Sequence, residues 1–273
     1  MVHFAVSSMF FHEYPCEEVF DFVTESGLDA IEFWVETPHF WLRDMPLDEL
    51  CACIAHHPGL SPVNLHAPIL DLNPCSINPK VAEASIYYTL LSIELAEKAG
   101  AEVVTIHPGR RTAKRPPSGE DYDRFERYIS LVRSVSRGKK VQISIENMEK
   151  KVNSLLSTPE ELRELLDREP WLSFTLDVSH AMGVSLEEIF RYLSFCSDRM
   201  INVHMSRAND GKMHLPLDRS EAGCQVLRQL SDYGYGGSVT IEIEDRNFTG
   251  DLSSEEKILL LSRELEFMRE FLV

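Results

Sequence analysis

Histidines and carboxylates recur where short apolar runs of this 273-residue chain come to an end. In chain order these residues are His66, His107, Glu146, Asp177 followed by His180, His204, and Glu242 followed by Glu244. Imidazole and carboxylate together form the donor set of a borderline divalent cation, with Zn²⁺ or Mn²⁺ expected and Co²⁺ or Fe²⁺ as alternatives. Mg²⁺ and Ca²⁺ prefer more oxygen and less imidazole. The residues therefore predict metal-assisted chemistry, provided that the fold brings them together.

Eight apolar runs supply the elements that must position these residues, and each run is followed by a stretch with helical periodicity. The runs are "HFAVSS", "AIEFWVE", "PVNLHAP", "EVVTIHPG", "VQISIEN", "LSFTLDVSH", "INVHMS" and "SVTIEIED". Eight such units in a chain of this length predict a single α/β domain over residues 1–273, a (β/α)₈ TIM barrel. The carboxyl ends of all barrel strands meet at one rim, so residues from 66 to 244 should converge on one cavity.

The order of several motifs resembles one known superfamily. "LHAPILDLN", "TIHPG", "SIENM", "LDVSH", "NVHMS" and "TIEIE" are similar to the xylose isomerase-like barrels. That superfamily includes sugar and sugar-phosphate isomerases and epimerases and the apurinic endonuclease IV enzymes. The resemblance implies that Glu146, Asp177, His204 and Glu242 bind the catalytic metal, and that Glu146 and Glu242 also form the acid/base pair. Glu242 is chosen over Glu244 because it directly closes the run "SVTI".

The mechanism that fits this assignment is isomerisation or epimerisation of a sugar or sugar phosphate. A metal bound to the substrate carbonyl and a neighbouring hydroxyl would stabilise an enediolate, while one carboxylate removes a proton and another returns one. The partner is then a small molecule. A barrel that binds a sugar without turning it over uses the same residue types, so a non-catalytic sugar-binding protein stays open as an alternative.

Endonuclease IV is the second alternative, with zinc-dependent hydrolysis of phosphodiesters. His66, His107 and His180 match additional zinc-ligand positions of those enzymes, and together with His214 they are predicted to hold a second metal or the substrate. The endonucleases place an aspartate and a histidine between the last two strands, where this chain has Lys212 and His214. Nucleic acid is the less favoured partner, because a formal net charge of −17 makes a phosphate-binding surface harder to build.

A basic loop follows the fourth run in this acidic chain. Arg110, Arg111, Lys114 and Arg115 lie within residues 105–119 with no acid among them. If the loop hangs over the rim, Arg110 and Arg111 could hold a phosphate or another anion, and Arg207 and Arg246 are further candidates. The opposing interpretation is a solvated loop.

The remaining patterns indicate the surroundings of the protein. The N-terminus lacks the basic and apolar segments of a secretory signal, and no apolar run is long enough to span a bilayer. The six cysteines form no CxxC pair, which favours reduced thiols and a cytoplasmic location. The sequence leaves open whether the chain forms a homo-oligomer. Helix starts are predicted at Thr158 and Ser253, each with a glutamate three residues later, as in a reciprocal capping box.

Overall fold

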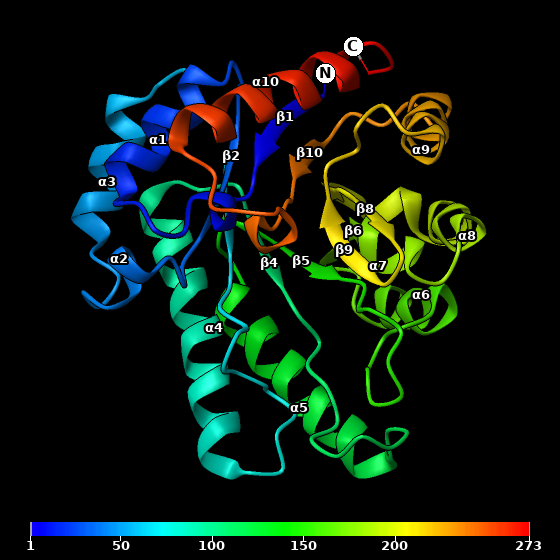
Figure 1. Ribbon diagram of the computed structural model, residues 1–273. Helices are drawn as coiled ribbons and strands as arrows, with labels where there is room; N and C mark the ends of the chain where they lie inside the picture. Colours follow the sequence, from blue (N-terminus) through cyan, green and yellow to red (C-terminus); the bar gives the residue numbers. More distant parts are fainter. Residues whose placement is uncertain (1, 273) are drawn as a thin grey trace.

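The computed structural model, which describes residues 2–272, contains eight parallel strands in a nearly closed barrel with helices around it (Figure 1). The strands are β1 (His3–Val6), β2 (Ile31–Trp34), β3 (Val63–His66), β4 (Val103–Ile106), β5 (Gln142–Glu146), β6 (Leu172–Asp177), β7 (Met200–Met205) and β10 (Ser238–Ile241). Their order is β1-β10-β7-β6-β5-β4-β3-β2, and a single bridge between Ser7 and Glu32 joins the two ends. The predicted (β/α)₈ barrel is confirmed.

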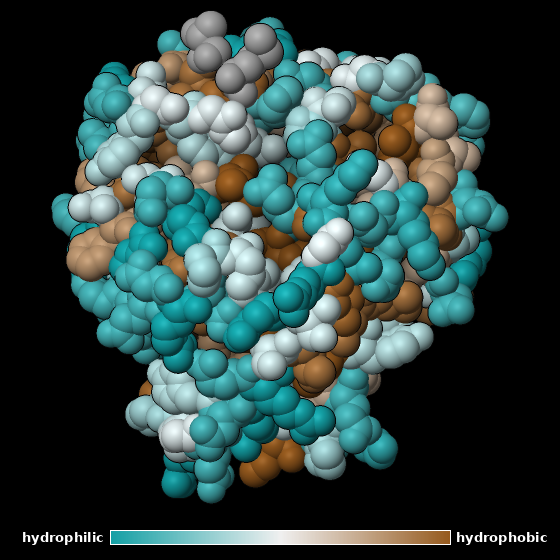
Figure 2. All heavy atoms as spheres, turned by 180° about the vertical axis from the view of Figure 1, so that it is seen from behind, coloured by the Kyte–Doolittle hydropathy of each residue, from teal (hydrophilic) through white to brown (hydrophobic). Residues whose placement is uncertain are grey.

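Helices cover the outside of the barrel and connect its strands. The longer ones are α1 (Cys16–Glu25), α3 (Leu47–His56), α4 (Pro79–Ala99), α5 (Gly119–Ser136), α6 (Pro159–Arg168), α8 (Leu186–Cys196), α9 (Glu221–Asp232) and α10 (Ser254–Arg269). Short helices are α2 (Pro38–Trp41) and α7 (Val178–Met182), with 3₁₀ turns η1 (Ser8–Phe11), η2 (Ser197–Arg199) and η3 (Asp245–Asn247). On the face shown in Figure 2, hydrophilic side chains predominate and hydrophobic ones appear in patches. Among residues 2–272, no helix has the length and hydrophobicity needed to cross a membrane.

Alternation along the strands separates an apolar layer from a polar one. Side chains such as Leu65, Val104, Ile145 and Val203 are fully buried in the core. Their strand neighbours belong to the opposite face, because successive residues of a strand point to opposite sides. That face carries a lower layer of buried polar residues and, two residues further along every strand that contributes to this layer except β2, the predicted site residues. The lower layer consists of Glu32, Asn64, Thr105, Ser144, Thr175, Asn202 and Thr240.

A hairpin that the sequence patterns did not predict follows β7. It pairs β8 (Arg207–Asn209) with β9 (Lys212–Leu215) in antiparallel fashion. Asp210 and Gly211 make the turn with φ values of 50° and 76°. An Asp-Gly pair with positive φ at both positions is typical of a two-residue hairpin turn. The hairpin matters because it carries His214 toward the rim of the barrel.

The capping predictions are correct in position and partly wrong in detail. Ser253 and Glu256 form the full reciprocal box at the start of α10. At α6, Thr158 Oγ1 accepts from the Glu161 N–H at 3.3 Å, but the Glu161 carboxylate accepts from the Ser157 N–H at 3.0 Å. The chain turns one residue earlier there, so the carboxylate reaches the residue before the cap.

Thr158→Ala is expected to lower the free energy of unfolding by about 1 kcal/mol, because the first turn of α6 loses a side-chain acceptor. Urea denaturation of the variant beside the wild type measures the loss. Thr158→Ser retains the hydroxyl and should recover most of the stability. Equal losses in the two variants would contradict the capping role.

Candidate metal centre

Four predicted ligands converge at the carboxyl end of the barrel. Glu146, Asp177, His204 and Glu242 each offer one donor atom, and these atoms all lie within 4.8 Å of one another. The first three lie at the ends of β5, β6 and β7, and Glu242 follows β10 directly. His204 Nδ1 lies 3.0 Å from Glu242 Oε2 and 3.3 Å from Glu146 Oε2. All four residues are buried.

The donor atoms of this four-residue group fit a divalent cation. Within the described residues, Asp177 Oδ2, His204 Nδ1 and Glu242 Oε2 are buried and have no hydrogen-bond partner. A buried polar atom without a partner costs about 1–3 kcal/mol, and unpaired buried carboxylates cost more. A cation among these atoms would satisfy them together and offset the charge of three carboxylates.

A second group shares Glu146. His107 Nε2 lies 3.0 Å from Glu146 Oε2, and His66 Nε2 lies 3.4 Å from the same oxygen. His66 Nδ1 is 2.8 Å from the Ala67 carbonyl, which orients the ring so that Nε2 faces the group. Glu146 Oε2 thus contacts His66 and His107 of the second group as well as His204 of the first. This arrangement could hold a second cation beside the first.

A third group is formed by Asp177, His180 and His214, whose donor atoms also lie within 4.8 Å of one another. His180 Nδ1 is 2.9 Å from the Asn147 carbonyl, and the His214 N–H donates to Ser179 Oγ at 2.9 Å. His214 is therefore a buried member of the site. Lys212, the residue at the aspartate position of the endonucleases, is exposed.

Burial and neighbouring charges act in opposite directions on the pKa values of these buried groups. The balance raises the pKa values of Asp177, His180 and His204. Burial raises the pKa of Asp177 to about 7. Burial opposes the charged form of His180, but Asp177 and Glu146 raise its pKa to about 10. Burial likewise opposes the charge on His204, yet Glu242, Glu32 and Glu146 hold its pKa well above its usual range. A cation must therefore displace a tightly held proton from His204, so its binding releases protons.

A cavity of about 520 Å³ opens beside the second and third groups, whose histidines His107 and His180 contact Glu146. Its wall includes His107, His180 and His214, and four cations stand around it: Arg110, Lys151, Lys212 and Arg246. Glu244 also lines the cavity, where it pairs with Arg246. Glu242 is thus the glutamate inside the four-residue group, and Glu244 belongs to the cavity wall.

The cations predicted to hold an anion are divided by the structure. Arg110 and Arg246 line the cavity, whereas Arg111 and Arg207 do not. The Arg111 guanidinium donates to the Pro116 carbonyl at 2.6 Å and pairs with Asp121 at 3.7 Å. Arg207 Nε donates to the Pro216 carbonyl at 2.8 Å. Arg111 is therefore held by its own loop and by Asp121 of α5, and Arg207 by the chain segment after β9, away from the cavity.

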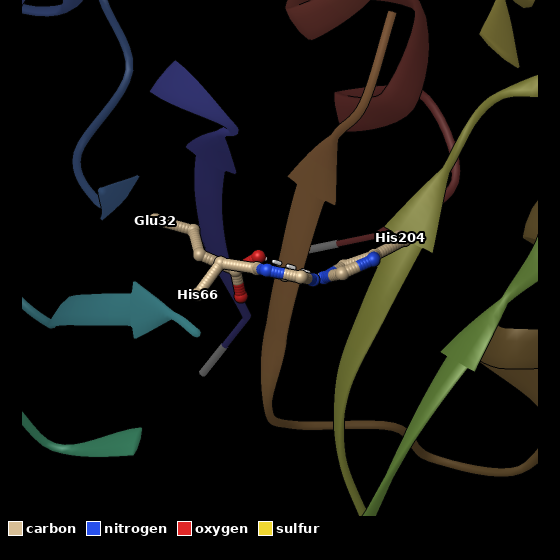
Figure 3. Close-up of side chains that lie close together, drawn as sticks. All are labelled: Glu32, His66 and His204. Atoms are coloured by element: carbon tan, nitrogen blue, oxygen red, sulfur yellow. Dashed lines mark ion pairs between the residues drawn. The ribbon is translucent and has the colours of Figure 1, made fainter. Parts of the chain in front are cut away.

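Two residues near the centre were missed by the sequence reasoning. Asn147 accepts from the Asp177 N–H at 2.7 Å and donates to the Asp177 carbonyl at 3.0 Å, so it joins the ends of β5 and β6. Glu32 lies beside His204 and His66 (Figure 3). The sequence feature that could have indicated Glu32 is the presence of an acidic residue inside the otherwise apolar run "AIEFWV".

Comparison with known proteins agrees with this geometry. Residues 20–271 match the family described as the xylose isomerase-like TIM barrel. An uncharacterized protein of Methanocaldococcus jannaschii, MJ1188, is 36% identical over 275 residues, which cover 100% of both chains. The chain belongs to the xylose isomerase-like TIM barrel family.

Solved structures with the same fold include enzymes of two reaction types. A D-tagatose 3-epimerase-like protein superposes with a TM-score of 0.75 at 25% identity, with 98% of each chain covered. Endonuclease IV from Thermus thermophilus gives a TM-score of 0.71 at 18% identity, also with 98% of each chain covered. The chain thus shares its fold with a sugar epimerase-like protein and with a nuclease.

Proposed function

We propose that the protein is a divalent-metal-dependent isomerase or epimerase of a sugar or sugar phosphate. The observation that carries this proposal is the placement of Glu146 and Glu242. Their carboxylates approach His204 Nδ1 from two different strands, at 3.3 and 3.0 Å. Two carboxylates beside one position suit a proton transfer next to a carbonyl, because one can remove a proton and the other can return one.

The residues of the site have two proposed roles, which are binding of the cation and transfer of the proton. Glu146, Asp177, His204 and Glu242 would hold the cation, which supplies stabilisation of negative charge on substrate oxygen. Glu146 and Glu242 move the proton to and from a substrate carbon. Trp34 lies next to His66 with its ring 5.8 Å away, edge to face, and this packing helps to fix the position of the His66 ring.

The cavity suits a small anionic substrate. Its volume of about 520 Å³ lies within the usual range of small-molecule sites, which is about 300–1,000 Å³. Arg110 stands on its wall as a phosphate ligand, with Lys151 and Arg246 available if they leave Glu149 and Glu244. A phosphorylated sugar is therefore the preferred substrate class.

Zinc-dependent phosphodiester hydrolysis is the second candidate, and one observation favours it. His66, His107 and Glu146 form a group of their own that shares Glu146 with the first. Two cations held close together by a shared carboxylate are a common arrangement for phosphate ester hydrolysis. An isomerase mechanism needs only the four-residue group.

The number of bound metals separates the two candidates. Protein purified without chelator is to be analysed for metal content as wild type, His66→Ala and Glu146→Ala. We expect one metal per chain that survives His66→Ala and is lost in Glu146→Ala, because His66 lies outside the four-residue group. His57→Ala is the control, since this histidine contacts Asp21 and the Cys53 carbonyl instead.

Two or three zinc ions, with His66 needed for the additional ones, would favour the hydrolase and make cleavage of an abasic duplex the next assay. Absence of metal after incubation with Zn²⁺ and Mn²⁺ would contradict both candidates.

A further inference from the structure

Glu32 is a fully buried acid on β2 that the proposed mechanism does not use. Its Oε2 accepts from Asn202 Nδ2 at 2.7 Å and from Thr105 Oγ1 at 3.1 Å. Its Oε1 lies 2.8 Å from His204 Nε2. An ionised acid inside a barrel is costly unless polar groups compensate it, and three side chains from other strands do so here.

His204 lies between Glu32 and the other members of the four-residue group. In Figure 3 the Glu32 carboxylate and the His204 ring, which come from β2 and β7, point toward one another. Nε2 of this ring faces Glu32, whereas Nδ1 faces Glu146 and Glu242. A histidine that binds a cation through one nitrogen carries its proton on the other. A carboxylate beside Nε2 therefore favours the form in which Nδ1 is free to bind.

The contact between Glu32 and His204 is an ion pair, not an aligned hydrogen bond. Across the described part of the chain, Glu32 Oε1 and His204 Nε2 have no hydrogen-bond partner of suitable angle, although they lie 2.8 Å apart. Each is thus the nearest available partner of the other. A small turn of the imidazole ring would satisfy both atoms, which otherwise stay unpaired in the barrel interior.

We propose that Glu32 is a positioning residue of the metal centre, which holds the Nε2 proton of His204 so that Nδ1 is directed at the cation. This inference rests on the metal-dependent function proposed above. Carboxylates that orient metal-binding histidines in this way commonly strengthen metal affinity about 10–100-fold.

Glu32 could instead be a ligand, since it also forms a close group with His66 and His204. The direction of the His204 ring argues against this role. Its Nδ1 faces Glu146 and Glu242, whereas Glu32 lies beside Nε2, on the other side of the ring. The second Glu32 oxygen is already held by Asn202 and Thr105.

Glu32→Gln tests the proposal because it retains the shape of the side chain. Polar groups lie beside both Glu32 oxygens, and a carboxylate only accepts. Glutamine has one acceptor oxygen and one NH₂ donor group, so it must turn the NH₂ toward either His204 or the donors Asn202 and Thr105. One of the two contacts is then lost. Zn²⁺ affinity, measured by competition with a chromogenic chelator, is expected to fall about 10–100-fold with the number of bound ions unchanged.

Two further measurements separate positioning from a general structural role. The Zn²⁺-loaded wild type should show a slowly exchanging imidazole N–H proton at low field in its NMR spectrum, assigned to His204, and Glu32→Gln should lose it. Thr105→Val removes one hydrogen bond to Glu32 and preserves the carboxylate, so a loss in affinity of about 2–5-fold is expected even if Glu32→Gln folds poorly. Glu264→Gln is the control, because Glu264 is also buried but accepts from the Leu217 and Asp218 N–H groups.

Each outcome decides one question. Wild-type affinity in Glu32→Gln with an unchanged N–H proton would overturn the positioning role and leave the proposed function intact. Loss of one whole ion per chain in that variant would also overturn it, since Glu32 would then be a ligand. A wild type that binds neither Zn²⁺ nor Mn²⁺ would overturn the proposed function and this inference together.

Discussion

Glu146→Gln is expected to lower kcat by at least about a thousandfold, at the upper end of what removal of an acid/base group costs. The substitution removes the charge of a buried carboxylate whose oxygens contact His66, His107, His180 and His204. An amide can neither accept a proton from substrate carbon nor offset a cation. Turnover of ketoses and their phosphate esters in D₂O measures the effect, because epimerisation exchanges a carbon-bound proton with solvent.

Glu149→Gln is the matched control for this experiment. Glu149 lines the cavity next to the site but pairs with Lys151 and lies outside the metal-binding groups. Its kcat should stay within about threefold of the wild type, as expected for a residue with no part in the transition state. If Glu146→Gln retained both substrate affinity and turnover, the epimerase mechanism would be wrong. A wild type that binds sugar phosphate without turnover would identify a binding protein.

Lys257→Met is expected to lower the free energy of unfolding by about 2–4 kcal/mol. Lys257 lies on α10 and is 1% exposed. Its ammonium group donates to the Phe10 carbonyl at 2.7 Å and to Asp245 Oδ2 at 3.1 Å, and it lies 5.1 Å from the Phe10 ring centroid. Methionine fills a similar volume but leaves a buried carbonyl and a half-buried carboxylate without their donor.

Chemical denaturation of the metal-free protein measures this loss. Lys80→Met is the control, since it removes the same charge from an exposed lysine whose pair with Glu83 is at the surface. It should leave stability unchanged within error. Equal effects of the two substitutions would show that net charge, and not the buried contact, stabilises the protein. Because Lys257 links α10 to η1 and η3, its loss should also loosen the cavity wall at Arg246 and Asn247.

Local periodicity was sufficient to predict the strands of the barrel and the positions at which they end. A strand such as "VVTIH" alternates apolar and polar residues, and one side of that alternation must face the core. The rim of a barrel collects the carboxyl ends of all its strands, so strand ends at His66 and Glu242 could be placed together without coordinates. The convergence of the predicted ligands thus follows from the pattern and the fold class alone.

Direction and pairing of long side chains required the tertiary structure. Glu32 was missed because its partners Thr105, Asn202 and His204 come from strands far along the chain, and nothing local indicates that they meet. Arg111 belongs to the predicted cation cluster but is held by Asp121 in the following helix. A residue type and its place on a strand depend on local sequence. The partner that a flexible side chain selects depends on which strands the barrel makes adjacent, so only the folded chain decides it.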